Sequence, residues 1–120
     1  MTRDEQPPPA EGDARVGARP RSELKDVCAE LEALPPGETR QARLAQGFLT
    51  ACRWALGVET IGPVTGGPLE TDFAMPYLTA ESDAAAVRLE SLSPGSAAHD
   101  YVEGVHVALA WLCGQSEERP

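Results

Sequence analysis

A short pattern that occurs twice constrains the fold of this chain more than any other feature. Residues 47–57 read GFLTACRWALG, and residues 104–114 read GVHVALAWLCG. Glycine, alanine, tryptophan and glycine stand at the same places in both segments, 57 positions apart. Self-similarity at a fixed offset is typical of repeated supersecondary units. The repeat positions are Gly47, Ala51, Trp54, Gly57, Gly104, Ala108, Trp111 and Gly114.

The repeated pattern predicts close packing between two helices. Gly47, Ala51 and Trp54 fall on one row of a helix, and the second copy repeats that row. A glycine inside a helix costs about 1 kcal/mol relative to alanine, so a glycine at the same place in both copies indicates a steric need. We therefore expect the two helices to cross near Gly47 and Gly104.

Apolar residues at helical spacing predict four helices, over residues 23–34, 38–56, 80–91 and 94–113. Ser22 is the expected N-cap of the first helix, Thr79 or Ser82 of the third, and Ser93 of the fourth, with Pro94 at its first position. Gly57 and Gly114 are expected to end the second and fourth helices. The pairing of short and long helices predicts two αα-hairpins.

The sequence thus predicts a mainly α fold, a four-helix bundle with a pseudo-two-fold internal repeat. Hairpins over residues 22–57 and 79–114 are joined by a long irregular loop, 58–78, within a single domain spanning 21–114. A short β-hairpin turning at Gly66-Gly67 is an alternative for part of that loop. Residues 1–20, rich in proline and glycine, are expected to form a disordered tail, and residues 115–120 a frayed end.

Charge and cysteine content narrow the class of protein. The chain has 19 acidic and 10 basic residues and a net charge of −9, which argues against direct binding to nucleic acid. It contains no stretch typical of a membrane span or a secretory signal, so we expect a cytoplasmic protein. Cys28, Cys52 and Cys113 lack the C-x-x-C spacing of zinc and redox sites and are expected to be buried free thiols. Abundant alanine, glycine, proline and arginine suggest a high-GC bacterium or its phage.

One pair of residues has the spacing of metal ligands. Glu103 and His106 form a Glu-x-x-His pair, as in di-iron bundles, which require two such pairs. The equivalent positions in the other copy, Gln46 and Leu49, do not supply the second pair. A homodimer would supply it, but we expect no metal, no cofactor and no catalytic set. The glycine-rich segment 62–67 lacks the Lys-Ser/Thr of a phosphate loop.

These observations predict a non-catalytic protein-binding module: an adaptor, an inhibitor or a regulator of a protein partner. An enzymatic or metal-binding bundle using Glu103 and His106 is one alternative, and a subunit of a homo-oligomeric assembly, such as a homodimer, is another. The acidic faces of the helices, acting as a mimic of nucleic acid, are an alternative to the loop as the binding surface. The loop is partly apolar and is flanked by acidic residues, Glu59 and Glu81 among them. The expected partner-binding residues are Ile61, Val64, Leu69, Asp72, Phe73 and Tyr77.

Overall fold

The computed structural model describes residues 15–59, 62–66 and 74–117. Within these ranges the chain forms four helices, α1 (Arg21–Glu32), α2 (Arg40–Leu56), α3 (Ala74–Ser91) and α4 (Ala97–Leu112). Two short antiparallel strands, β1 (Arg15–Val16) and β2 (Arg19–Pro20), precede them. The predicted mainly α four-helix bundle is confirmed.

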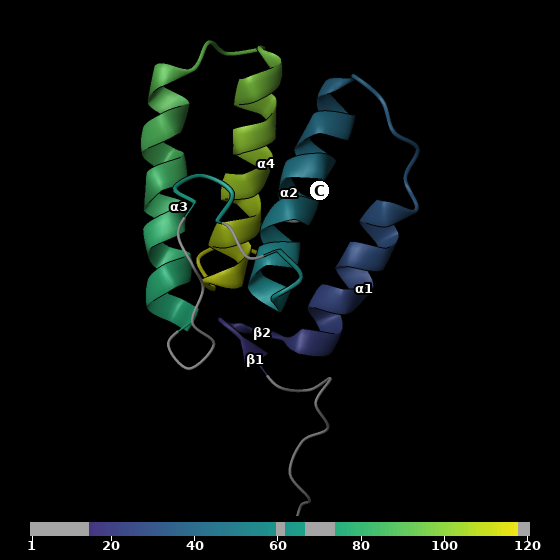
Figure 1. Cartoon of the computed structure of the whole chain (residues 1–120), viewed down its shortest axis with the longest axis vertical. Coiled ribbons are helices and arrows are strands. Elements are labelled where there is room, and N and C mark those ends of the chain that lie inside the picture. Colours follow the sequence, from purple (N-terminus) through teal and green to yellow (C-terminus); the bar gives the residue numbers. More distant parts are fainter. Residues whose placement is uncertain (1–14, 60–61, 67–73, 118–120) are drawn as a thin grey trace, which may run out of the picture.

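Helices α2 and α4 form the centre of the bundle. Helix α1 packs beside α2 and α3 packs beside α4, so the spatial order is α1-α2-α4-α3 (Figure 1). The core lies chiefly on the central pair, where Phe48, Trp54 and Trp111 are buried. The rings of Phe48 and Trp111 meet at a centroid distance of 5.8 Å. Each outer helix therefore covers one side of a central pair that supplies most of the large apolar side chains.

The two central helices touch main chain to main chain at the repeated glycines, as expected. A Cβ atom on Gly47 would overlap the carbonyl oxygen of Tyr101, and one on Gly104 would overlap that of Leu44. Leu44 and Tyr101 are themselves 57 positions apart, so the two contacts are reciprocal across the offset. Glycine is required at both places because any side chain would push the helices apart.

The ends of the central helices also correspond across the offset. The hydroxyl oxygens of Thr39 and Ser96 each accept a hydrogen bond of 3.1 Å from the backbone three residues on. At the other end, Gly57 and Gly114 adopt positive φ angles of 86° and 79°. Their backbone N–H groups donate to the carbonyls of the two tryptophans, at 3.0 and 3.1 Å. The predicted role of both glycines as helix terminators is confirmed.

All four helix starts differ from the prediction, and α2 begins at Arg40 rather than at residue 38. Helix α1 begins at Arg21 after Pro20, without a side-chain cap from Ser22. Helix α4 begins at Ala97 and is capped by Ser96, because Gly95 between Pro94 and that cap has a φ of 86°, which a right-handed helix does not contain. Helix α3 begins at Ala74 rather than near residue 80, since Pro76 lies in its first turn, where the missing N–H costs nothing. Thr79 and Ser82 consequently lie inside the helix and cap nothing.

The predicted domain boundaries change at both ends. Residues 15–20 belong to the folded domain, because β1 and β2 pair and Val16 is buried at 6% exposure; residues 1–14 lie outside the described ranges. Residues 115–117 are held as well: the Arg19 guanidinium donates to the carbonyls of Trp111 and Ser116, at 2.8 and 2.7 Å. The predicted loop shortens because residues 74–78 are helical, and its described part, 62–66, forms a turn and no strand.

Candidate partner-binding groove

A groove of about 860 Å³ runs over one face of the bundle. The central helices form its floor, where Ala45 and Leu49 of α2 meet Val102 of α4. One wall is the end of α1 with the proline-rich turn that follows it, and the other is the segment 62–66 with α3. Figure 1 shows this segment crossing in front of α3 and α4. Every helix of the bundle therefore contributes to the groove.

The lining is largely apolar and open to solvent. Leu34, at the end of the α1 wall, is 52% exposed, while Leu31 on the same wall is half-buried. Val64 and Tyr101 are half-buried on the other side and at the floor. An exposed apolar concavity of this kind is a candidate interaction surface, because covering it displaces water at a gain in free energy.

Four charged residues lie on the lining, and three of them are arginines. Arg53 forms an ion pair of 2.8 Å with Glu32 across the α1–α2 contact. Arg43 is directed to α4, where it meets Asp100. Arg88, in the last turn of α3, is exposed and makes no ion pair within the described ranges. The lining thus carries more basic than acidic residues, in a protein whose net charge is −9.

A buried carboxylate fixes Arg43 in this position. Asp100 is 1% exposed, and its Oδ2 atom accepts hydrogen bonds from Nε and Nη2 of Arg43 at 3.0 and 2.7 Å. Arg40 lies further out, with its Nε atom 3.6 Å from Oδ1 of Asp100 and its Nη2 atom 2.8 Å from Glu103. Because a buried charge is tolerated only when it is paired, this network locks α2 to the beginning of α4.

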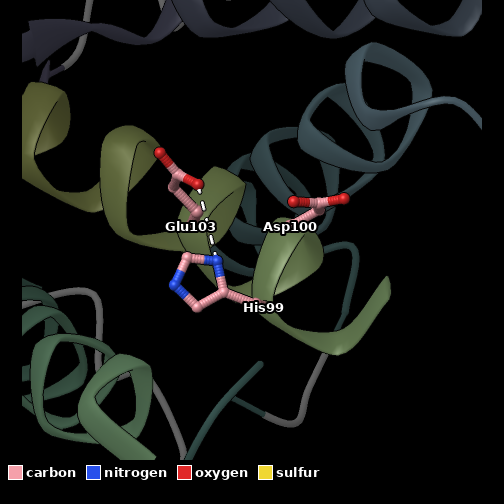
Figure 2. Close-up of side chains that lie close together, drawn as sticks. All are labelled: His99, Asp100 and Glu103. Atoms are coloured by element: carbon pink, nitrogen blue, oxygen red, sulfur yellow. Dashed lines mark ion pairs between the residues drawn. The ribbon is translucent and has the colours of Figure 1, made fainter. Parts of the chain in front are cut away.

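Three residues of the same helix have the geometry of metal ligands. His99, Asp100 and Glu103 each place one ligand atom within 4.8 Å of the others (Figure 2). The dashed line in Figure 2 joins His99 Nδ1 to Glu103 Oε1, 3.7 Å apart. Both carboxylates, however, are already paired with the guanidinium groups of Arg40 and Arg43. The positive charge that a cation would bring is therefore supplied by the protein itself.

Glu103 and His106, the predicted metal pair, do not lie together as their spacing in the sequence predicts. Glu103 turns to His99 and Asp100, and His106 is not part of the ligand group found in the described ranges. His106 is half-buried further along α4. A spacing of three residues predicts that Glu103 and His106 share one face of the helix, but the ion pair with Arg40 of α2 directs Glu103 toward the beginning of the helix instead.

The predicted partner-binding residues separate in the structure. Val64 lines the groove, whereas Tyr77 belongs to α3 and packs, half-buried, against the core. The other four, Ile61, Leu69, Asp72 and Phe73, lie outside the described residues. Of the two described residues in that prediction, Val64 is the one that lines the groove, beside Pro63 of the same loop.

Glu81 holds Val64 in place, a role that its sequence position did not suggest. Its side chain is buried, at 2% exposure, rather than part of an acidic surface. One carboxylate oxygen accepts hydrogen bonds from the backbone N–H groups of Val64 and Thr65, and the other accepts from the Thr65 hydroxyl at 2.6 Å. A carboxylate that accepts from three donors is a strong anchor. It ties the segment 62–66 to α3 and so shapes one wall of the groove.

The cysteines lie away from the open part of the groove. Cys28 and Cys52 are buried between α1 and α2, and Cys113 is half-buried at the end of α4. The hydrogen bond between Cys28 and Cys52, together with burial, raises the pKa of the Cys52 thiol far above its usual range. The same hydrogen bond lowers the pKa of Cys28, and burial raises the pKa of Cys113.

Comparisons with known proteins give no relative for this chain. No family model, no curated protein and no solved structure matches it. Within the described ranges, no helix has both the length and the apolar character needed to cross a membrane. The function must accordingly be argued from the groove and its charges.

Proposed function

We propose that this chain is a non-catalytic protein-binding module that holds a segment of a partner protein in the groove. The observation that carries this proposal is the groove itself, a preformed concavity of about 860 Å³ with an exposed leucine at its rim. A partner side chain that covers Leu34 would bury apolar surface on both proteins, worth roughly 25 cal/mol per Å² before the costs of association.

The charged groups on the lining favour binding over catalysis. General acid–base chemistry requires a carboxylate or imidazole that is free to exchange a proton with a ligand. Glu32 is instead committed to Arg53, and the nearby Asp100 to Arg43. These ion pairs stiffen the walls, and a stiff wall lowers the entropy lost when a partner is bound.

A protein partner suits the charge of the chain better than a nucleic acid does. The net charge of −9 opposes the approach of a phosphate backbone, and the arginines of the groove are three in number and mostly paired. We place the module in the cytoplasm, where its three free thiols would stay reduced.

The pseudo-two-fold repeat is part of the same proposal. Four features of the central helices recur at the 57-residue offset: the N-caps, the glycine contacts, the tryptophans and the terminal glycines. The Arg43–Asp100 ion pair joins two positions that have the same offset. In a two-fold arrangement, residue i of one unit contacts residue j of the other, and residue j of the first contacts residue i of the second. Gly47 meets the main chain at Tyr101, and Gly104 meets the main chain at Leu44, in this reciprocal way. Two such units would build the floor of the groove at their junction.

A matched pair of substitutions tests the proposal. Leu34→Glu places a charge on the groove, and Val58→Glu places the same charge at a valine that is 69% exposed and does not line the groove. Wild-type protein and both variants are immobilised, exposed to lysate of the native cells, and the eluates identified by mass spectrometry. We expect one stoichiometric partner on the wild type and on Val58→Glu, and its loss on Leu34→Glu.

Two other outcomes would contradict the proposal. A partner retained equally by both variants would bind elsewhere on the surface. A wild-type protein that captures nothing, and whose elution volume shows a dimer that Leu34→Glu converts to a monomer, would make the groove an interface between copies of this chain. Circular dichroism of both variants confirms that each remains folded.

A further inference from the structure

We infer that the occupant of the groove is an amphipathic helix that carries carboxylate side chains beside its apolar face. This inference rests on the proposed function and adds the chemistry of the partner. It follows from the charge that the lining leaves unpaired, from the helical surfaces that bound the groove, and from its size.

The groove differs in charge from the chain as a whole. The protein carries a net charge of −9, yet its lining holds three arginines and one acid. Arg43 and Arg53 are paired with Asp100 and Glu32, which leaves Arg88 as the cation without a partner within the described ranges. An exposed, unpaired guanidinium at the rim of an apolar groove favours a carboxylate on the partner, since complementary charges select the partner and set its register.

Arg88 stands where such a carboxylate would be recognised. It lies on the same wall as Val64, which Glu81 fixes to α3 through three hydrogen bonds. The guanidinium therefore borders an apolar contact that is held in place. A helix that lays its apolar stripe along the floor would present the flank of that stripe to Arg88, and a glutamate or aspartate on that flank would pair with it.

The surfaces that bound the groove favour a helix over an extended strand. A bound strand needs an open sheet edge to supply main-chain hydrogen bonds. The described strands are two residues long and lie at the opposite end of the bundle from the α1–α2 turn that borders the groove (Figure 1). Helices α1 to α4 use their main-chain groups internally, so they offer side chains alone, as the grooves that receive amphipathic helices do.

The size of the groove agrees with this mode of binding. A volume of about 860 Å³ lies at the upper end of the range for small-molecule pockets and accommodates several side chains. An amphipathic helix presents such side chains from successive turns, at positions i, i+3, i+4 and i+7. The floor made by Leu49 and Val102 lies between the two walls and would receive this stripe.

The test uses the full chain and two synthetic peptides as probes. Both are amphipathic helices of about 18 residues with the same leucine stripe, and they differ in carrying glutamate or lysine beside that stripe. Binding is measured by fluorescence anisotropy at low and at physiological salt. We expect the glutamate peptide to bind and the lysine peptide to bind about tenfold more weakly or not at all, with the difference shrinking as salt is added.

Charge reversal at one position makes the test specific. Arg88→Glu should weaken the glutamate peptide about fivefold or more and strengthen the lysine peptide. Lys25→Glu is the matched control, because it makes the same change of charge at an exposed residue of α1 outside the groove. It should leave the preference between the two peptides unchanged.

The outcomes separate this inference from the proposed function. If both peptides bind equally and Leu34→Glu weakens both, the groove binds helices but the carboxylate assignment is overturned. If the lysine peptide is preferred, or if neither peptide binds, the inference is wrong as a whole. The proposed function then depends on the capture experiment with Leu34→Glu and Val58→Glu, which makes no assumption about the shape or charge of the partner.

Discussion

Arg43 and Asp100, which stand 57 positions apart, are joined by two hydrogen bonds to the same carboxylate oxygen, at 3.0 and 2.7 Å. Arg43 comes from the first turn of α2, and Asp100 from the first turn of α4. The pair therefore sits at corresponding positions of the two central helices and links them where both begin. It also sets the direction of one arginine of the groove.

Removing Arg43 should destabilise the protein strongly. Arg43→Ala leaves the buried Asp100 carboxylate with Arg40 alone, 3.6 Å away, and the loss of its hydrogen-bonded partner should cost roughly 3 kcal/mol of the free energy of unfolding. Arg40→Ala is the matched control: the side chain of Arg40 is 58% exposed, so its loss should cost less than about 1 kcal/mol. Urea denaturation followed by circular dichroism measures both. An equal loss of stability in the two variants would show that the Arg43–Asp100 pair is not what links α2 to α4.

Alanine at either repeated glycine should separate the central helices. Gly47→Ala and Gly104→Ala each place a methyl group against a carbonyl oxygen of the opposite helix. We expect each to lower the free energy of unfolding by about 2 kcal/mol or more, although alanine is the better helix former. Gly37→Ala is the control, since its added Cβ would meet only the Ala42 methyl group at 3.8 Å. Thermal midpoints near that of the wild type for the first two variants would contradict the close approach.

The anchor at Glu81 should control both stability and the groove. Glu81→Ala removes the acceptor of three hydrogen bonds, and we expect a loss of about 2–3 kcal/mol in the free energy of unfolding. Amide hydrogen exchange at Val64 and Thr65 should accelerate more than exchange in α2. Asp83→Ala, at an exposed acid on the same helix, should change neither. Unaltered exchange at Val64 in Glu81→Ala would mean that other contacts hold the segment.

The three thiols should differ in reactivity. Iodoacetamide attacks the thiolate, and the raised pKa and full burial of Cys52 suppress that form. We expect native protein near pH 8 to be alkylated first at Cys113, because it is half-buried, whereas Cys28 is only 7% exposed despite its lowered pKa. Cys52 should react only after unfolding in denaturant. Peptide mapping by mass spectrometry at timed intervals gives the order. Rapid modification of Cys52 in native protein would show that the α1–α2 contact opens readily.

The sequence was sufficient for the class of fold and for the contact between its central helices, because both follow from periodic local patterns. The repeat located Gly47 and Gly104, and the same offset, applied upstream, also relates Thr39 to Ser96, the two N-caps. The proline after Ser93 favours Ser93 as a cap, yet the positive φ of Gly95 places the helix start three residues later.

The groove itself could not be predicted from a local pattern. Its walls come from α1, from the segment 62–66 and from α3, and the distance between these elements depends on tertiary packing. The burial of Glu81 could not be predicted for the same reason, because its hydrogen-bond donors are the backbone N–H groups of Val64 and Thr65, 17 and 16 residues earlier in the chain. No sequence pattern distinguishes Arg88 from the other arginines, because its lack of an ion pair within the described ranges stands out only when Arg43 and Arg53 are seen to pair with Asp100 and Glu32.

Photo-crosslinking from the groove would show directly whether a protein partner occupies it. A benzophenone amino acid replaces Leu34 in one sample and Val58 in another, both exposed in the free protein. Each is irradiated in lysate of the native cells, and covalent adducts are identified by mass spectrometry. We expect one abundant adduct with a protein from position 34 and none from position 58. Adducts from position 58 alone, or equal adducts from both, would contradict the proposed function.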